Sequence, residues 1–329
     1  MKALVTGATG FIGSNLVREL LKQGSQVRAL VRKESNQRNI HDLSIEIVFG
    51  DLRDKTSLEG ALDDCDVLFH VAASYTFWAP DPRVIYETNV LGTENILNLA
   101  LAKGIKKIVY TSTESTIGIN KNGCPGNDAI QANAGDLAGH YKKSKLMAEE
   151  SALRMCQDGL PLVVVNPTMP VGPGDVKPTP TGQVIVNFLN RKMPACVNTG
   201  LNTVDVEDVA KGHILALEKG HIGERYILGN KNVTFREILN ILERITGIKA
   251  PRLDIPLWLA LGAGYADEFI SGKILNKHPR IPISAVKTAR KFRHFDCSKA
   301  IQELGFPQTS VVEAFKKAVR WFRQNGYSN

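Results

Sequence analysis

The stretch VTGATGFIG at residues 5–13 decides the fold, because it sets three glycines between an apolar strand-like run and a helix-like run. When such a unit binds a dinucleotide, Gly7 permits the tight turn and Gly10 lets backbone amides approach a pyrophosphate, while Gly13 allows close packing of helix on strand. The helix N-terminus adds amide donors and partial positive charge. The spacing G-x-x-G-x-x-G differs from the usual G-x-G-x-x-G, so a turn that binds nothing is the alternative.

Up to about residue 170, apolar strand-like runs alternate with helix-like segments. The runs are KALVTG, QVRALV, IEIVFG, DVLFHVAA, KKIVYTS and PLVVVNP. Continuous apolar runs bounded by helices indicate buried parallel strands. We therefore predict an α/β fold in which residues 1–170 form a doubly wound, Rossmann-type sheet that binds NAD(P).

The alternation of strand-like and helix-like segments does not continue in the second half, residues 171–329. VGPGDVKPTPTG is rich in Gly and Pro and is expected to be a loop. Three later segments are helical by their periodicity, and the first of these, from Asp205, has a plausible N-cap in that residue with Asp208 three positions on. We expect a smaller, mostly helical cap that binds the substrate, with some of its segments returning to the first domain.

Cysteine usage and charge limit the classes of function. The five cysteines are scattered and form no C-x-x-C pair, which argues against a structural zinc site or disulfides and suits a reducing compartment. We therefore expect a cytoplasmic protein without a metal. The net charge is +8, but Lys and Arg are spread along the chain without a basic run, so nucleic acid is not an expected partner.

The most apolar stretch of the second half is IPLWLALGAGYADEFI, residues 255–270. It is interrupted by Asp267 and Glu268 and is too short for a transmembrane segment. We interpret it as a core or lid helix, with attachment to a membrane interface or contact with a substrate as alternatives.

The second strand-like run ends in VRALVRKES, which bears on the choice of cofactor. An NAD site places Asp or Glu at this strand end for the ribose 2′-hydroxyl, whereas a basic residue accommodates a 2′-phosphate. Arg32 and Lys33 stand here, with Glu34 next, so NADP(H) is favoured with Arg32 as the main contact. NAD(H) bound through Glu34 is the alternative. After the third run, Asp51 could accept a hydrogen bond from the adenine amino group.

Two stretches point to acid–base chemistry. YTSTES, residues 110–115, follows the fifth run, and HYKKSKLMAEE places Tyr141 and Lys145 four apart, on one helix face. An ammonium beside a phenol favours the phenolate, which makes tyrosine a usable acid or base near neutral pH. The hydroxyl of Thr113 could bond the same substrate oxygen, with Ser112 as the neighbouring candidate.

Together with the glycine turn, these motifs resemble the extended short-chain dehydrogenase/reductase family. The resemblance rests on TGATGFIG, HVAA, NVLGT, YTSTES, YKKSK and NPTMPVGPGD and extends to VDVEDVA in the cap. It implies a catalytic Thr113, Tyr141 and Lys145, with Asn89 of NVLGT supporting the site. The family often has Ser where Thr113 stands.

Ligands of such sheets bind at the carboxyl ends of the strands, and this rule defines the remaining candidate residues. For the cofactor they are Gly7, Thr9, Gly10, Phe11, Ile12, Gly13, Arg32, Lys33, Asp51, Leu52, Ala72, Ala73, Thr111, Tyr141, Lys145 and Pro167. For the substrate they are Ser74, Tyr75, Trp78, Glu114, Asn166 and Pro170. The aromatic pair Tyr75 and Trp78 could equally pack against the cap.

Within the resembled family, NPTMPVGPGD and VRALVR are similar to dihydroflavonol-4-reductase-like carbonyl reductases. The full layout and YTFWAPDP also resemble the hopanoid-associated sugar epimerase group. We therefore expect an NADP(H)-dependent oxidoreductase acting on a carbonyl or alcohol. The alternatives are a nucleotide-sugar epimerase or dehydratase and a non-catalytic dinucleotide-binding protein. The long helices around 84–103 and 138–157 could pair two copies into a homodimer.

Overall fold

The computed structural model describes residues 1–329 except residues 120–123, 276, 278, 280–281 and 329. Its large sheet has seven parallel strands in the order β3-β2-β1-β4-β5-β6-β9. The bounds are β1 Lys2–Thr6, β2 Gln26–Val31, β3 Glu46–Phe49, β4 Val67–His70, β5 Lys107–Thr111, β6 Leu162–Pro167 and β9 Arg225–Leu228. This arrangement confirms the predicted doubly wound α/β fold.

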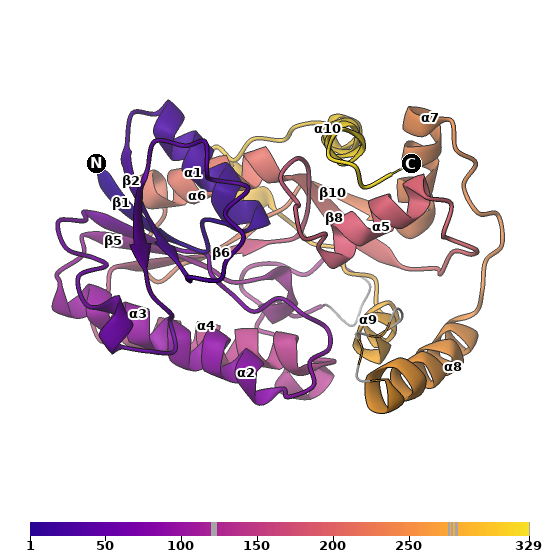
Figure 1. Ribbon diagram of the computed structural model, residues 1–329, viewed down its shortest axis with the longest axis horizontal. Helices are drawn as coiled ribbons and strands as arrows, with labels where there is room; N and C mark the ends of the chain where they lie inside the picture. Colours follow the sequence, from indigo (N-terminus) through magenta and orange to yellow (C-terminus); the bar gives the residue numbers. More distant parts are fainter. Residues whose placement is uncertain (120–123, 276, 278, 280–281, 329) are drawn as a thin grey trace.

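Helices cover both faces of this sheet (Figure 1). One face carries α1 (Phe11–Lys22) and α6 (Val206–Lys219), whose apolar side chains share a core with β1, β2 and β4. The other carries α3 (Gly92–Ala102) and α4 (His140–Gln157). The central strands are buried on both faces, which explains why they are apolar throughout in the sequence.

The second half of the chain divides between the large sheet and a separate layer. Its strand β9 and helix α6 belong to the large sheet and its cover. A three-stranded sheet that the sequence did not predict has the order β10-β8-β7. Its strands are β7 Met169–Val171, β8 Gly200–Asp205 and β10 Lys231–Thr234, and the helices packed on it are α5 Pro180–Leu189, α7 Phe235–Thr246 and α10 Val311–Gln324.

The long helix expected around residues 84–103 is not continuous. It runs as α2 (Arg83–Tyr86), a π-helical turn η2 (Glu87–Leu91) and α3. Two further π-helical turns are η5 (Glu268–Ile274) and η6 (Ala300–Leu304). Short 3₁₀ turns are η1 Thr56–Leu58, η3 Glu114–Thr116 and η4 Ala134–Asp136.

The apolar stretch at residues 255–270 forms α8 (Leu257–Asp267), which lies beside α9 (Ile283–Thr288) at the periphery (Figure 1). Within α8 only Ala260 and Gly264 are buried. The interpretation as a core helix is therefore wrong, because most of its apolar side chains face outward. Among the residues that the structure describes, no helix combines the length and apolar character needed to cross a bilayer.

Candidate active site

The turn after β1 contains three glycines, and each has a different environment. Gly7 has φ of +70°, and a Cβ there would lie 2.7 Å from the amide nitrogen of Ala72. A Cβ on Gly13 would lie 2.1 Å from the carbonyl oxygen of Gly7, so α1 packs this closely only with glycine at that position. Gly10 is exposed, and no side chain in the described part of the chain caps α1. This open helix N-terminus fits a pyrophosphate.

A buried hydrogen-bond chain fixes the end of β4 beside this turn. Strand register places Thr6 next to His70, and the Thr6 hydroxyl accepts from the amides of Val71 and Ala72, both at 3.2 Å. His70 bonds Thr6 through Nδ1 at 2.8 Å and Thr93 through Nε2 at 2.9 Å. Burial and the nearby positive charge of Lys145 lower the pKa of His70 to about 3, so the imidazole is neutral. It links Thr6 to Thr93 through its two ring nitrogens.

Asn89 lies in the π-helical turn η2 and joins two parts of the site. Its Oδ1 accepts from the amide of Ser74 at 2.7 Å, and its Nδ2 donates to the hydroxyl of Ser144 at 2.9 Å. Ser144 in turn donates to the carbonyl oxygen of Tyr141 at 2.8 Å. The side chain of Asn89 therefore holds the loop after β4 against the first turn of α4, as the resemblance implied for a supporting residue. Single π-helical turns within helices are frequent at functional sites.

Thr113 and Tyr141 meet at the carboxyl ends of the strands. Thr113 follows β5, caps η3 and accepts from the amide of Ser115 at 3.3 Å. Tyr141 lies in the first turn of α4, near enough to Thr113 for the Thr113 hydroxyl to influence its pKa. Burial raises the pKa of Tyr141, and the nearby Thr113 hydroxyl opposes this rise only in part. That the two hydroxyls hold a single substrate oxygen stays a prediction.

Lys145 lies one turn further along α4 and is 1% exposed. Its ammonium donates to the Tyr110 hydroxyl at 2.9 Å and to the Thr111 carbonyl oxygen at 2.8 Å. Burial lowers the pKa of Lys145 to about 7, while the charge of Glu149 acts to raise it. A direct bond to Tyr141 is not among its contacts with the described residues, so its effect on the Tyr141 pKa stays a prediction.

A buried ion pair that sequence reasoning missed lies behind these residues. Glu149 is fully buried and pairs with Arg225 of β9 at 3.1 Å. It also accepts from the Thr116 hydroxyl at 2.7 Å and from Asn166 Nδ2 at 2.9 Å. Asn166, predicted to contact the substrate, is also fully buried, and it donates to the Thr113 carbonyl oxygen at 3.1 Å. It is therefore placed to position Thr113 from behind.

The two residues before Thr113 have different surroundings. The Thr111 hydroxyl donates to Nε2 of His213 at 2.8 Å, because Nδ1 of this histidine donates to the carbonyl oxygen of Val209. Burial lowers the pKa of His213 to about 4, so it stays neutral. The Ser112 hydroxyl is buried and has no hydrogen-bond partner among the described residues, which leaves it open to bond a bound ligand.

The predicted adenosine end of the site is more exposed. Arg32, Lys33 and Glu34 all follow β2 with exposed side chains, so each is accessible to a ribose or its phosphate. The Asp51 carboxylate accepts from the guanidinium of Arg53 at 2.7 Å, which lowers the pKa of Asp51. The other predicted cofactor residues have backbone positions at strand ends and turns: Thr9, Phe11 and Ile12 in the glycine turn and α1, Leu52 after β3, Ala72 and Ala73 after β4, and Pro167 at the end of β6.

Aromatic and charged side chains lie on the side of the site where the substrate is predicted to bind. The Tyr75 ring lies 4.7 Å from that of Tyr141, and Trp78 lies against Gly272 of η5. Glu114 forms a largely buried ion pair with Arg293. Ser74 is held by Asn89, and Pro170 lies in β7. Of the six predicted substrate residues, Tyr75 thus stands next to the candidate catalytic tyrosine.

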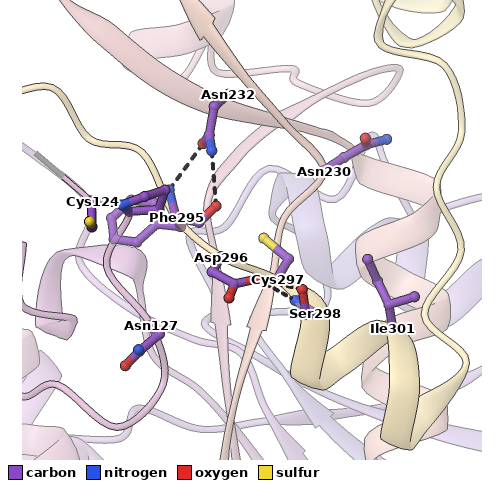
Figure 2. A pocket seen from close by; sticks show the side chains of 10 residues that line it. Cys124, Asn127, Asn230, Asn232, Phe295, Asp296, Cys297, Ser298 and Ile301 are labelled. Atoms are coloured by element: carbon purple, nitrogen blue, oxygen red, sulfur yellow. Dashed lines mark hydrogen bonds between the residues drawn. The ribbon is translucent and has the colours of Figure 1, made fainter.

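A separate cavity of about 500 Å³ is lined by residues of three segments, around 124–127, 230–232 and 295–301 (Figure 2). Polar side chains that line it are hydrogen-bonded to neighbouring residues. Asn232 donates to the carbonyl oxygen of Phe295 and accepts from its amide, and the Asp296 carboxylate accepts from the Ser298 hydroxyl. None of the predicted catalytic or cofactor residues lines it. This cavity is therefore not the candidate active site.

A model of the NAD-dependent epimerase/dehydratase family matches residues 3–229. The chain belongs to this family. A Synechocystis protein provisionally named dihydroflavonol 4-reductase is 47% identical, with 98% of this chain and 95% of that protein covered. Sterol demethylase protein B from Methylococcus capsulatus is 34% identical, with 99% of each chain covered. The crystal structure of gox2253 is 40% identical, with a TM-score of 0.89 and 99% of each chain covered.

These findings confirm the resemblance stated from the motifs. The chain is an NAD(P)-dependent oxidoreductase of the extended short-chain dehydrogenase/reductase type. Sequence reasoning missed the groups that hold the site together, His70, Glu149, His213 and Arg225. The signal for His70 was its place at the end of a strand in HVAA, whereas Glu149 carried only helical spacing from Lys145.

Proposed function

We propose that this chain is an NADP(H)-dependent carbonyl reductase similar to the dihydroflavonol 4-reductases. The observation that carries the proposal is the placement of Tyr141 and the buried Lys145 one turn apart on α4, with Thr113 at the adjacent end of β5 and the glycine turn in the same sheet. The names of the relatives support a reductase. A homodimer through α3 and α4 stays a prediction.

The roles of the residues follow from their positions. Tyr141 gives its proton to the substrate oxygen during reduction and takes it back during oxidation, while Thr113 holds the same oxygen in place. The Lys145 ammonium makes this exchange easier because positive charge favours the phenolate. The nicotinamide, when bound, supplies or accepts the hydride. The open N-terminus of α1 would hold the pyrophosphate, and Arg32 a 2′-phosphate.

The test is Tyr141→Phe, with Tyr86→Phe as the matched control. Tyr86 is half-buried near the start of α4, where its hydroxyl lies 3.2 Å from His140 Nδ1. Turnover is measured with NADPH and with NADH over flavonoid-like, aldehyde and nucleotide-sugar substrates. We expect Tyr141→Phe to lose turnover by about 10²-fold or more and to keep cofactor binding, because only the proton donor is removed. Undiminished turnover in Tyr141→Phe would contradict the assignment.

The second candidate is a nucleotide-sugar epimerase or dehydratase, which the description of the matching family favours. In such a reaction the cofactor is reduced only transiently, so NADPH is not consumed overall. The same screen separates the two: a carbonyl reductase oxidises one NADPH per product, whereas an epimerase converts the sugar nucleotide with no change in NADPH.

A further inference from the structure

The helix α8 and the π-helical turn η5 that continues it present an apolar surface to solvent. Its members, which we call the α8 patch, are Trp258, Leu259, Tyr265, Phe269, Ile270 and Ile274. Their exposed fractions reach 71% for Trp258 and 63% for Ile274. Trp258, Tyr265 and Phe269 are spaced seven and four residues apart, so they line one side of the helix. An apolar surface of this extent usually marks an interaction site.

The acidic residues of this helix are turned inward. Asp267 accepts from the Ser271 hydroxyl at 2.7 Å, and Glu268 accepts from the backbone amide of Ile283 at 3.0 Å. Both carboxyl side chains are partly buried. A surface helix of a globular protein ordinarily buries its apolar face and exposes its charges. Here that pattern is inverted, and the outward face has no negative charge to oppose an anionic partner.

The chain around the α8 patch is strongly cationic. In sequence, residues 269–295 contain seven Lys or Arg and neither Asp nor Glu; the described ones with exposed side chains are Lys277, Lys287, Arg290 and Lys291, whereas Arg293 is buried in its ion pair with Glu114. Lys287 lies over the ring of Tyr265 at 5.8 Å, so this positive charge borders the patch. Arg290 and Lys291 are also exposed, and Lys291 approaches Asp136 at 3.4 Å. Clusters of four to eight such cations beside an apolar helix face are typical of binding to anionic lipid.

We propose that the α8 patch docks on an anionic phospholipid bilayer, with α8 lying in the plane of the interface. Trp258, Tyr265 and Phe269 enter the headgroup region, where aromatic rings are favoured, and Lys287 and Arg290 meet lipid phosphates. A second copy of this chain fits less well, because pairing two patches would bring two cation-rich segments together.

The α8 patch is connected to the loop that carries Tyr75, on the predicted substrate side of the site. Gly272 of η5 lies against Trp78, and the hydroxyl of Ser284 in α9 donates to the carbonyl oxygen of Phe77 at 2.9 Å. Both contacts are to the loop that carries Tyr75 next to Tyr141. A bilayer bound at the α8 patch therefore lies beside the loop of the candidate active site, so lipid-dissolved molecules are concentrated near it.

The test is flotation of the purified full chain with vesicles. One set is phosphatidylcholine alone, and the other contains equal parts of phosphatidylcholine and phosphatidylglycerol. We expect binding to the anionic set that weakens as salt rises. The double variant Trp258→Glu/Phe269→Glu should lower the partition coefficient at least about tenfold, because apolar area is lost and like charge is added. Lys287→Gln should lower it about fivefold, the share of one cation near the surface.

Ile222→Glu is the matched control, since Ile222 is 59% exposed in the turn before β9 and lies outside the patch. It should bind like the unaltered chain. Absence of binding to anionic vesicles would overturn the proposal, as would equal binding by the patch variant and the control. A change of sedimentation coefficient in the patch variant alone would also overturn it, because that result assigns the surface to a second copy. No readout uses turnover, so the outcome is independent of the proposed reaction.

Discussion

Replacing Glu149 by Gln removes one charge from the buried ion pair with Arg225 and changes little else in shape. The amide oxygen of Gln can still accept from Thr116 and Asn166, which bond the carboxylate at 2.7 and 2.9 Å. The guanidinium, by contrast, keeps its burial and loses its counter-charge. Leaving one buried charge unpaired costs about 3–5 kcal/mol, so we expect Tm to fall by roughly 5–15 °C.

The control is the same Glu-to-Gln change at position 224, the residue directly before Arg225. Glu224 is half-exposed and pairs with Lys299 at 2.6 Å on the surface. Surface pairs contribute about 0–1 kcal/mol, so Glu224→Gln should leave Tm nearly unchanged. Thermal unfolding followed by circular dichroism compares the two variants. Equal Tm values for Glu149→Gln and Glu224→Gln would refute the reasoning.

Glu149→Gln also has an expected effect on pH dependence. The Glu149 charge raises the pKa of Lys145, which burial has lowered to about 7. Without that charge the ammonium is lost at a lower pH. If the ammonium supports Tyr141, the alkaline limb of the kcat profile moves to lower pH. A limb that moves to higher pH would contradict the assigned sign.

Two further predictions concern the cofactor and stability. Arg32→Ala should raise KM for NADPH about tenfold or more and leave KM for NADH unchanged, because only NADPH carries the 2′-phosphate. The control is Lys22→Ala, which changes an exposed side chain of α1. A preference for NADH in the unaltered chain would contradict the role of Arg32. Burial raises the pKa of Asp128 from 3.8 to about 6, so its stabilising protonated form is fully present below 3.8 and is lost as pH rises through 6. Asp128→Asn should therefore raise the free energy of unfolding by about 1–3 kcal/mol near pH 7.5 and hardly at pH 4, as checked by urea titration.

The sequence predicted the central strands because strands buried on both faces are apolar throughout and need no knowledge of their partners. The four-residue strand β9 could not be predicted in this way, since only its pairing with the distant β6 makes it a strand. The three residues of β7 are too few to show alternation. The core position predicted for α8 was wrong for another reason. Its apolar composition indicated burial, but whether a helix is buried depends on packing against distant segments, which composition does not encode.

Local spacing was similarly informative for part of the site. Tyr141 and Lys145 lie one turn apart on one helix, so a segment of five residues is enough to show how they are related. Glu149 and Arg225 are 76 positions apart, and nothing in the intervening sequence links them. The contacts of His213 with Thr111 span 102 positions. The candidate catalytic groups could therefore be predicted from the sequence, whereas the groups that hold them could not.

The place of β9 in the large sheet has a consequence for biosynthesis. When a ribosome has delivered β6, the sheet still ends in an unpaired edge, and Glu149 has no cation beside it. Both are completed only about sixty residues later, after β7, α5, β8 and α6 have been synthesised. Until β9 is synthesised, β6 would therefore present an unpaired strand edge, which is a surface prone to pair with other chains.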